Sequence, residues 1–278
     1  MAARHGSTGL AIGRAALSRG ALALAIVAPL LVGGCTGGAA LPTCATGGAS
    51  ACTRVLFLGN SFTYVNDLPG TFARLTQSGG RQVEVAMVAN GGETLSDHEA
   101  SPDSTGKIAA EDWNYVVLQE QSEQGATEGG RDFMYGPGRA LAEKAEAVGA
   151  VPMFFMTWAH EDGLPSAGLP DYDSMQKAVD AAYIQIAHEL VVPVAPVGFI
   201  WYIVHHDHPD ISLWQDDGSH PTEAGTYLAA SVFYASVFRQ SPSGLTFHGS
   251  LSDAQAKVMQ DAAAEYVLGN LESDWGLR

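Results

Sequence analysis

Three polar residues in two distant segments have the types and spacing that serine hydrolase chemistry requires. Ser61 follows the apolar run Val55–Leu58 and Gly59, a residue that permits a sharp turn. Asp217 and His220 lie three positions apart near the other end of the chain. In one turn, the carboxylate can hold one imidazole nitrogen and leave the other free as a base, which can activate a serine nucleophile. The structural alternatives are a helix N-cap for Ser61 and a capping turn for the Asp-x-x-His pair.

An alternation of strands and helices would bring these segments together. Apolar runs predict buried strands over residues 55–58, 83–88, 115–118, 151–157 and 191–194. Helical patterns cover residues 68–77, 140–148, 172–190, 221–238 and 254–268, and a less regular stretch precedes Trp113. This order predicts an α/β fold, a flavodoxin-like three-layer α/β/α sandwich with a five-stranded parallel sheet. In such a sheet the carboxyl ends of the strands gather at one edge, where Ser61 is placed.

Three blocks, in this order, resemble the SGNH (GDSL-like) hydrolase superfamily. Gly59-Asn60-Ser61-Phe62-Thr63 stands where that superfamily has its Gly-Asp-Ser nucleophile block, and Asp217-Gly218-Ser219-His220 matches its final Asp-x-x-His block. Asn90-Gly91-Gly92-Glu93-Thr94 corresponds to its glycine block. The resemblance spans residues 53–268 and implies a catalytic triad of serine, histidine and aspartate. The implied enzyme is an esterase that forms an acyl-enzyme, with acetylated polysaccharide, cell-wall glycan or a lipid ester as expected substrates.

The oxyanion hole departs from the superfamily pattern. Members use the amide of the nucleophile, a glycine amide and an asparagine side chain, and the resemblance assigns the first two to Ser61 and Gly92. After the third strand this chain has Leu-Gln-Glu-Gln-Ser and no asparagine. A glutamine amide offers the same donor one methylene further out, so Gln121 or Gln119 is the expected third donor, with Gln121 slightly favoured.

Three further residues are candidates for contact with the substrate, namely Asn60, Trp158 and His98. Trp158 ends a Met-Thr-Trp segment that resembles divergent branches of the superfamily, and a core position is equally compatible with its sequence context. For His98, the alternative is a surface position or one that supports the pocket. The reaction implied by the resemblance requires no cofactor and no metal.

Two alternatives lead to other functions, and a third changes only the acceptor. The segment His205-His206-Asp207-His208-Pro209-Asp210 contains residue types that bind divalent metals and could serve a metal-dependent hydrolase. A non-catalytic module could instead display Trp158, Trp201 and Trp214 to glycans. Acyl transfer to a sugar hydroxyl would use the same triad as hydrolysis.

The first 34 residues have the features of an export signal. Three arginines and no acid accompany an apolar segment, residues 21–32, that is short for a membrane span. Val32-Gly33-Gly34-Cys35 resembles a bacterial lipobox, which implies cleavage before Cys35 and its lipidation. We therefore expect a signal peptide over 1–34, a lipidated tether over 35–52 and a hydrolase domain over 53–278. The expected location is the cell envelope, with membrane attachment only through the lipid; an ordinary cleaved signal and an uncleaved anchor are the alternatives.

The net charge indicates which partners to expect, and the cysteines raise the question of a disulfide. Without the three arginines of residues 1–34, the formal net charge of −16 becomes −19 (−16 less 3). Such a chain repels phosphate backbones, so we expect no nucleic-acid partner. Export would permit a disulfide between Cys44 and Cys52, but their spacing alone leaves its formation open.

Overall fold

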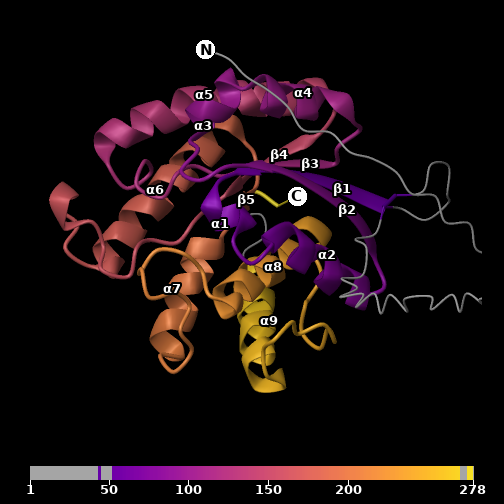
Figure 1. Ribbon diagram of the computed structural model, residues 1–278, viewed down its shortest axis with the longest axis vertical. Coiled ribbons are helices and arrows are strands. Elements are labelled where there is room, and N and C mark those ends of the chain that lie inside the picture. Colours follow the sequence, from indigo (N-terminus) through magenta and orange to yellow (C-terminus); the bar gives the residue numbers. More distant parts are fainter. Residues whose placement is uncertain (1–42, 45–51, 270–273, 278) are drawn as a thin grey trace, which may run out of the picture. The chain divides into compact units, whose positions relative to one another are not determined.

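The computed structural model describes residues 43–44, 52–269 and 274–277, which all belong to the unit Ala40–Arg278. The expected signal segment, Cys35 and most of the tether lie outside the described residues and stay predictions. The sheet contains five parallel strands in the order β2-β1-β3-β4-β5 (Figure 1). This is the flavodoxin-like doubly wound order, and the predicted fold class is confirmed.

The strands end level with one another along one edge of the sheet. They are β1 (Cys52–Gly59), β2 (Gln82–Ala89), β3 (Tyr115–Leu118), β4 (Val151–Phe155) and β5 (Val194–Ala195). Leu58 near the end of β1 pairs with Val88 of β2 and with Leu118 of β3, and Leu118 in turn pairs with Phe154 of β4. The loops that follow these strands therefore meet at the carboxyl edge of the sheet.

Helices cover both faces of this sheet (Figure 1). On one face lie α3 (Leu95–Ala100), α4 (Pro102–Ala110) and α5 (Glu128–Ala147), with α6 (Tyr172–Leu190) packed beside α5. On the other lie α2 (Leu68–Ser78), α7 (Val197–Asp207), α8 (Glu223–Phe238) and α9 (Asp253–Leu268). Two short helices, α1 (Ser61–Tyr64) and the 3₁₀ turn η1 (Pro165–Ala167), lie in loops after β1 and β4.

The core between the sheet and α8 is aromatic. Phe233 of α8 meets Phe57 of β1 and Phe155 of β4 edge-to-face, with ring centroids 5.2 and 5.0 Å apart. Residues 224–237 of α8 are buried, because α8 packs against the sheet, α2 and α9. A helix buried on all sides needs no polar face, which explains its predominantly apolar sequence.

Three helices differ from the sequence prediction, one in length and two in being formed at all. The expected helix 140–148 begins instead at Glu128 and includes Pro137. The stretch before Trp113 contains α3 and α4, each capped by a hydroxyl side chain, Thr94 for α3 and Ser101 for α4. Such side-chain caps satisfy the first backbone N–H groups and stabilise short helices.

The end of the sheet also differs from the prediction. The fifth strand covers Val194–Ala195 and not residues 191–194, because Val191 ends α6 in a left-handed conformation (φ 57°). The fourth strand ends at Phe155. The first three residues of the histidine-rich segment form the end of α7, which extends to Asp207.

Cys44 and Cys52 form a disulfide, which settles a point that the sequence left open. Cys52 is the first residue of β1, and the Cys44 amide donates to Glu84 Oε2 on β2 over 3.0 Å. The bridge therefore fastens the chain before the domain to the sheet itself, whereas the sequence suggested a bridge within the tether.

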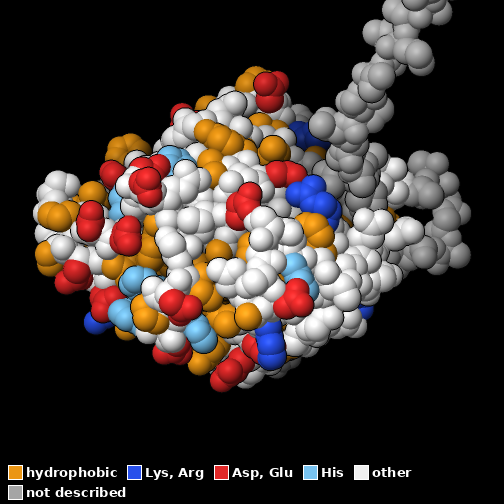
Figure 2. All heavy atoms as spheres, turned by 60° about the horizontal axis from the view of Figure 1, so that its bottom comes forward, with side chains coloured by type: hydrophobic (Ala, Val, Ile, Leu, Met, Phe, Trp, Pro, Cys, Tyr) orange, Lys and Arg blue, Asp and Glu red, His pale blue; other side chains and the backbone are white. Residues whose placement is uncertain are grey.

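Acidic side chains are spread over the described surface. On the face shown in Figure 2, Asp and Glu lie scattered among uncharged side chains, and Lys and Arg are sparse. Within the described residues, none of the helices is both long and apolar enough to cross a membrane.

Candidate active site

Ser61 is the first residue of α1 and not its cap. Asn60 is the N-cap, and its Oδ1 accepts a hydrogen bond from the Phe62 amide over 3.1 Å. The N-cap interpretation of Ser61 is therefore wrong. As the first helical residue, Ser61 has a backbone N–H without an intrahelical acceptor, and its side chain is only partly buried.

Gln119 is buried beneath residues 59–63, the segment that carries the predicted nucleophile Ser61 and that we call the nucleophile turn. Its Oε1 accepts from the Asn60 amide (2.8 Å) and from Thr63 Oγ1 (2.9 Å). Its Nε2 donates to Asn60 Oδ1 (2.9 Å) and to the Glu120 carbonyl (2.7 Å), which uses both amide hydrogens. Gly59 is required for this close approach, because a Cβ at that position would lie 2.4 Å from Gln119 Oε1.

Asp217 organises the turn that carries His220. Its Oδ1 accepts from the amides of Ser219 (3.0 Å) and His220 (2.9 Å), and its Oδ2 lies 2.6 Å from His220 Nδ1. Gly218 adopts φ 66°, the left-handed conformation that such a tight turn needs. The imidazole is thereby held through Nδ1, with Nε2 left for proton transfer.

The same contacts keep Asp217 ionised. The hydrogen bond with His220, ahead of those from the two amides, lowers the pKa of Asp217 to about 2. Asp217 therefore stays a carboxylate at any pH at which the protein would work, and it favours the Nδ1-protonated imidazole.

The glycine loop after β2 is held by Glu93. Both carboxylate oxygens of Glu93 accept from Asn90, one from its amide (2.9 Å) and one from its side chain (2.8 Å). The Asn60 side chain donates to the Glu93 carbonyl over 2.9 Å and so joins this loop to the nucleophile turn. Gly92, at the exposed tip, has φ 74°, which favours glycine there.

These segments surround one open cavity of about 450 Å³ at the carboxyl edge of the sheet. It is lined by Asn60, Ser61, Phe62, Tyr64, Gly91, Gly92, Gln121, Ser122, Glu123, His160, Ser219 and His220. The predicted nucleophile, base, oxyanion glycine and Gln121 are thus brought together, and Asp217 lies behind His220. Gln119 does not line the cavity. Of the two glutamines that the sequence offered as oxyanion donors, only Gln121 is therefore among the described residues that line it.

No family model matches the chain, and no curated protein matches it either. Among solved structures, a protein from Slackia heliotrinireducens assigned to the SGNH hydrolases is 31% identical, with a TM-score of 0.56 over 66% of this chain and 97% of that one. This chain belongs to the SGNH hydrolases. The finding confirms the predicted superfamily and the predicted class of enzyme, a hydrolase of the SGNH type.

Two more distant structures share the fold of this SGNH hydrolase. A DUF4886 family protein from Bacteroides uniformis is 18% identical, with a TM-score of 0.58 over 78% of this chain and 95% of that one. A catalytic mutant of an acetylxylan esterase from Geobacillus stearothermophilus is 16% identical, with a TM-score of 0.53 over 65% of this chain and 92% of that one.

Glu120, between the two glutamines, links the loop after β3 to α3 through hydrogen bonds. Its Oε1 accepts from the amides of Gln121 (2.6 Å) and Leu95 (3.2 Å). The side chain is fully buried, and burial raises its pKa to about 7, although the two backbone hydrogen bonds oppose this shift. This buried carboxyl group therefore stabilises the contact between the loop after β3 and α3, and its raised pKa lies near neutral pH.

Two of the predicted substrate contacts need correction. Trp158 and His98 are fully buried in this SGNH hydrolase, and neither lines the cavity. His98 lies 2.9 Å from the Gly59 carbonyl and 2.8 Å from Ser104 Oγ, so its polar atoms are used in the core. Both residues are therefore core residues behind the site and do not line its cavity. Asn60 does line the cavity, but its polar atoms hold the nucleophile turn and the glycine loop.

The tryptophans do not form an exposed platform for sugars. Trp158 and Trp201 stack on each other in the core with centroids 4.1 Å apart, and Trp214 is only 4% exposed. The glycan-binding alternative loses its basis, because aromatic platforms must be accessible.

The side chains of the histidine-rich segment contact different partners. His205 packs against the rings of Tyr172 and Trp214, while His206 Nε2 lies 3.0 Å from Asp173 Oδ1. Across the described part of the chain, no group of three or more His, Cys, Asp or Glu residues is placed to hold a metal ion. The alternative of a metal-dependent hydrolase therefore finds no assembled cluster at these histidines.

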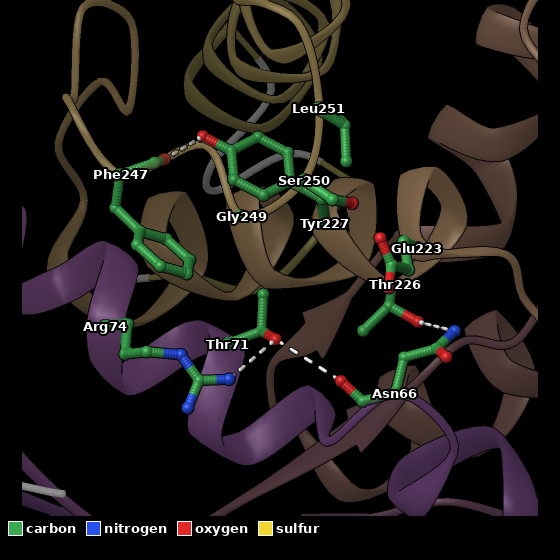
Figure 3. A pocket seen from close by; sticks show the side chains of 10 residues that line it. All are labelled: Asn66, Thr71, Arg74, Glu223, Thr226, Tyr227, Phe247, Gly249, Ser250 and Leu251. Atoms are coloured by element: carbon green, nitrogen blue, oxygen red, sulfur yellow. Dashed lines mark hydrogen bonds between the residues drawn. The ribbon is translucent and has the colours of Figure 1, made fainter. Parts of the chain in front are cut away.

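A second cavity, of about 310 Å³, lies between α2, α8 and the segment before α9 (Figure 3). Its polar groups bond mainly to one another: Asn66 Nδ2 donates to Thr226 Oγ1 (3.1 Å) and Tyr227 donates to the Phe247 carbonyl (2.7 Å). Arg74 pairs with Asp67 outside the cavity (3.2 Å). This cavity holds none of the predicted catalytic residues.

Ser122 and His160 are among the polar residues of the main cavity that the sequence did not identify. Ser122 follows β3 and His160 follows β4, so both obey the rule that singled out Ser61, a polar side chain after a strand at the carboxyl edge. Burial lowers the pKa of His160, which keeps its imidazole neutral at neutral pH.

Proposed function

We propose that this SGNH hydrolase is a serine esterase that cleaves carboxylic esters through an acyl-enzyme. The observation that carries the proposal is the 2.6 Å contact between Asp217 Oδ2 and His220 Nδ1, on an imidazole that shares its cavity with Ser61. His220 Nε2 takes the Ser61 proton as Oγ attacks the ester carbonyl. The tetrahedral intermediate collapses, the alcohol leaves with the proton from His220, and Ser61 is acylated.

Three donors around the cavity are suited to the oxyanion. They are the backbone N–H groups of Ser61 and Gly92 and the side-chain amide of Gln121. Gln121 lines the cavity, whereas both amide hydrogens of Gln119 are already donated. Loss of one such donor typically costs about 3–4 kcal/mol of transition-state stabilisation. In the second half of the reaction, His220 activates water, which releases the acid and restores Ser61.

The lining supports a short acyl group on a polar alcohol. Among the described residues that line the cavity, Phe62 and Tyr64 have large apolar side chains, and the others are polar or glycine. A long acyl chain would require a more extensive apolar wall. The fold shared with an acetylxylan esterase agrees with this proposal, so acetyl groups on a carbohydrate are the substrate we favour.

We also propose that the enzyme works at the cell envelope, held by a lipid on Cys35. The basic and apolar signal-like segment and the lipobox resemblance support this location. The Cys44–Cys52 disulfide agrees with an exported protein, because such bridges persist in oxidising compartments.

The test is the hydrolysis of p-nitrophenyl esters from acetate to palmitate by the mature domain and by the variants Ser61→Ala and His220→Ala. We expect kcat/KM to be highest for acetate and to fall at least 10³-fold in each variant. Wild-type rates in both variants would overturn the mechanism, and highest rates on long chains would overturn the substrate class. Product analysis with an added sugar acceptor distinguishes hydrolysis from acyl transfer.

A further inference from the structure

Ser122 and His160 form a hydrogen-bonded pair inside the cavity, and the proposed triad uses neither. Ser122 Oγ lies 2.9 Å from His160 Nε2. Gln121 Nε2 donates to the same Ser122 Oγ over 3.2 Å. The three side chains come from the loops after β3 and β4, and all three line the cavity.

The direction of the two Gln121 hydrogen bonds follows from one backbone group. The Glu123 amide donates to Gln121 Oε1 over 2.8 Å, so the oxygen of the Gln121 side chain must face that N–H. The nitrogen therefore faces Ser122 Oγ and donates to it. Ser122 Oγ then has its own hydroxyl proton to donate to His160 Nε2, an arrangement that uses a neutral ring protonated at Nδ1. Burial lowers the pKa of His160 and so favours this neutral form.

Both polar atoms of the Gln121 side chain are held by hydrogen bonds. Its oxygen is held by the Glu123 amide, and one of its two amide hydrogens is held by Ser122. The other amide hydrogen is left for a ligand in the cavity. A free glutamine side chain has several rotatable bonds, and an oxyanion donor works best when it is already oriented before the reaction.

We propose that Ser122 and His160 are positioning residues that orient the Gln121 amide toward the oxyanion. The inference rests on the proposed esterase function. It predicts that both residues act only through Gln121 and not by contact with the reacting atoms.

The test is a double-mutant cycle with p-nitrophenyl acetate, using Ser122→Ala, Gln121→Ala and the double variant, with Ser61→Ala in parallel. We expect Ser122→Ala to lower kcat about 10- to 100-fold with little change in KM, a part of the loss expected for the whole donor. In the Gln121→Ala background, Ser122→Ala should produce no further loss, because the group it orients is absent.

Variants of His160 provide the second arm. His160→Ala removes the acceptor for the Ser122 proton and should lower kcat as Ser122→Ala does. His160→Gln keeps an acceptor near the position of Nε2 and should retain activity within about threefold of wild type. His188→Ala, an exposed histidine on α6, is the control and should leave kcat unchanged. Thermal unfolding of each variant shows whether a loss reflects folding, and His160→Gln keeps the test decisive if His160→Ala does not fold.

Three outcomes would overturn the inference. An equal loss from Ser122→Ala with and without Gln121 would show an independent role, and wild-type kcat in Ser122→Ala would show none. In both cases an inactive Ser61→Ala leaves the proposed function intact. If Ser61→Ala stays active and a fluorophosphonate labels Ser122 in it, Ser122 is itself a nucleophile, and the proposed function fails together with the positioning role.

Discussion

The indole of Trp158 stacks on the ring of Phe62 with centroids 4.4 Å apart and an interplanar angle of 10°, while its N–H donates to the Ser219 carbonyl over 2.9 Å. Phe62 follows Ser61 in the chain, and Ser219 precedes His220. One buried side chain therefore contacts both α1, which begins at Ser61, and the turn that carries His220. It lies between them and does not line the cavity.

Replacing Trp158 by Phe should impair catalysis more than stability. Trp158→Phe keeps an aromatic ring on Phe62 but loses the bond to Ser219, worth about 1 kcal/mol of unfolding free energy. We expect kcat to fall about 10-fold or more, because small displacements of reacting groups are costly. Trp275→Phe is the matched control: it loses a similar indole–carbonyl bond, to Tyr266 (3.0 Å), away from the cavity. Equal kcat values in the two variants would contradict this role of Trp158.

Substitution of Gln119 should mainly lower stability, whereas substitution of Gln121 should mainly lower activity. Gln119→Ala leaves buried partners unsatisfied, among them the Asn60 amide, and should lower the unfolding free energy by about 2–3 kcal/mol or more. Gln121→Ala removes a side chain at the cavity and should change unfolding little while lowering kcat about 10²- to 10³-fold. Denaturant titration and steady-state kinetics on both variants check this; unimpaired turnover in Gln121→Ala would leave the oxyanion assignment without support.

Stability should depend on pH through Glu120. Burial raises the pKa of Glu120 from 4.5 to about 7, so between these values the folded state binds more protons than the unfolded state. The stabilisation is therefore fully present below about pH 4.5 and is lost as pH rises through about 7. Relative to Glu120→Gln, the wild type should lose up to about 3 kcal/mol of unfolding free energy over this range.

Denaturant titrations of both proteins at pH 4.5, 6, 7 and 8 measure this effect. Asp180, whose pKa burial also raises to about 7, is present in both proteins, so its contribution cancels in the difference. A difference that does not change with pH would show that Glu120 does not titrate in this range.

The Cys44–Cys52 disulfide should stabilise the domain without affecting catalysis. The bridge closes a short loop, with a sequence separation of 8, for which chain-entropy arguments give roughly 2–3 kcal/mol. The double variant Cys44→Ser/Cys52→Ser should lose about this much unfolding free energy and keep the wild-type kcat. Adding a reductant to wild type should reproduce the loss; a large fall in kcat in either case would show that the bridge also shapes the site.

The sequence predicts the fold well where local patterns are strong. The apolar run Val55–Leu58 and the amphipathic pattern of 172–190 are found as β1 and α6 almost without shift. The start of α5 could not be recognised because Gly129, Gly130 and Pro137 disfavour helix locally, and packing on α3 and the sheet overrides them. The two-residue strand β5 and the apolar start of α7 follow each other closely, and the sequence there has too little periodicity to show where the strand ends and the helix begins.

The candidate site is predictable only in part, because distant contacts decide it. The sequence places Ser61, Gly92 and His220 at one edge through the positions of strand ends. It does not reveal that Gln119 is buried beneath Asn60 while Gln121 faces the cavity, since a residue after a short strand can point either way. The pairing of Ser122 with His160 depends on a separation of 38 residues, which no local pattern encodes.

The acyl-enzyme is the most direct point at which to test the mechanism. The purified domain is mixed with a fluorophosphonate that mimics the tetrahedral intermediate, and the modified peptide is identified by mass spectrometry in wild type and in Asp217→Ala. Our account predicts a single adduct on Ser61 that forms in proportion to the loss of esterase activity and roughly 10²- to 10⁴-fold more slowly in Asp217→Ala. An adduct on another residue, or full esterase activity with Ser61 modified, would contradict it.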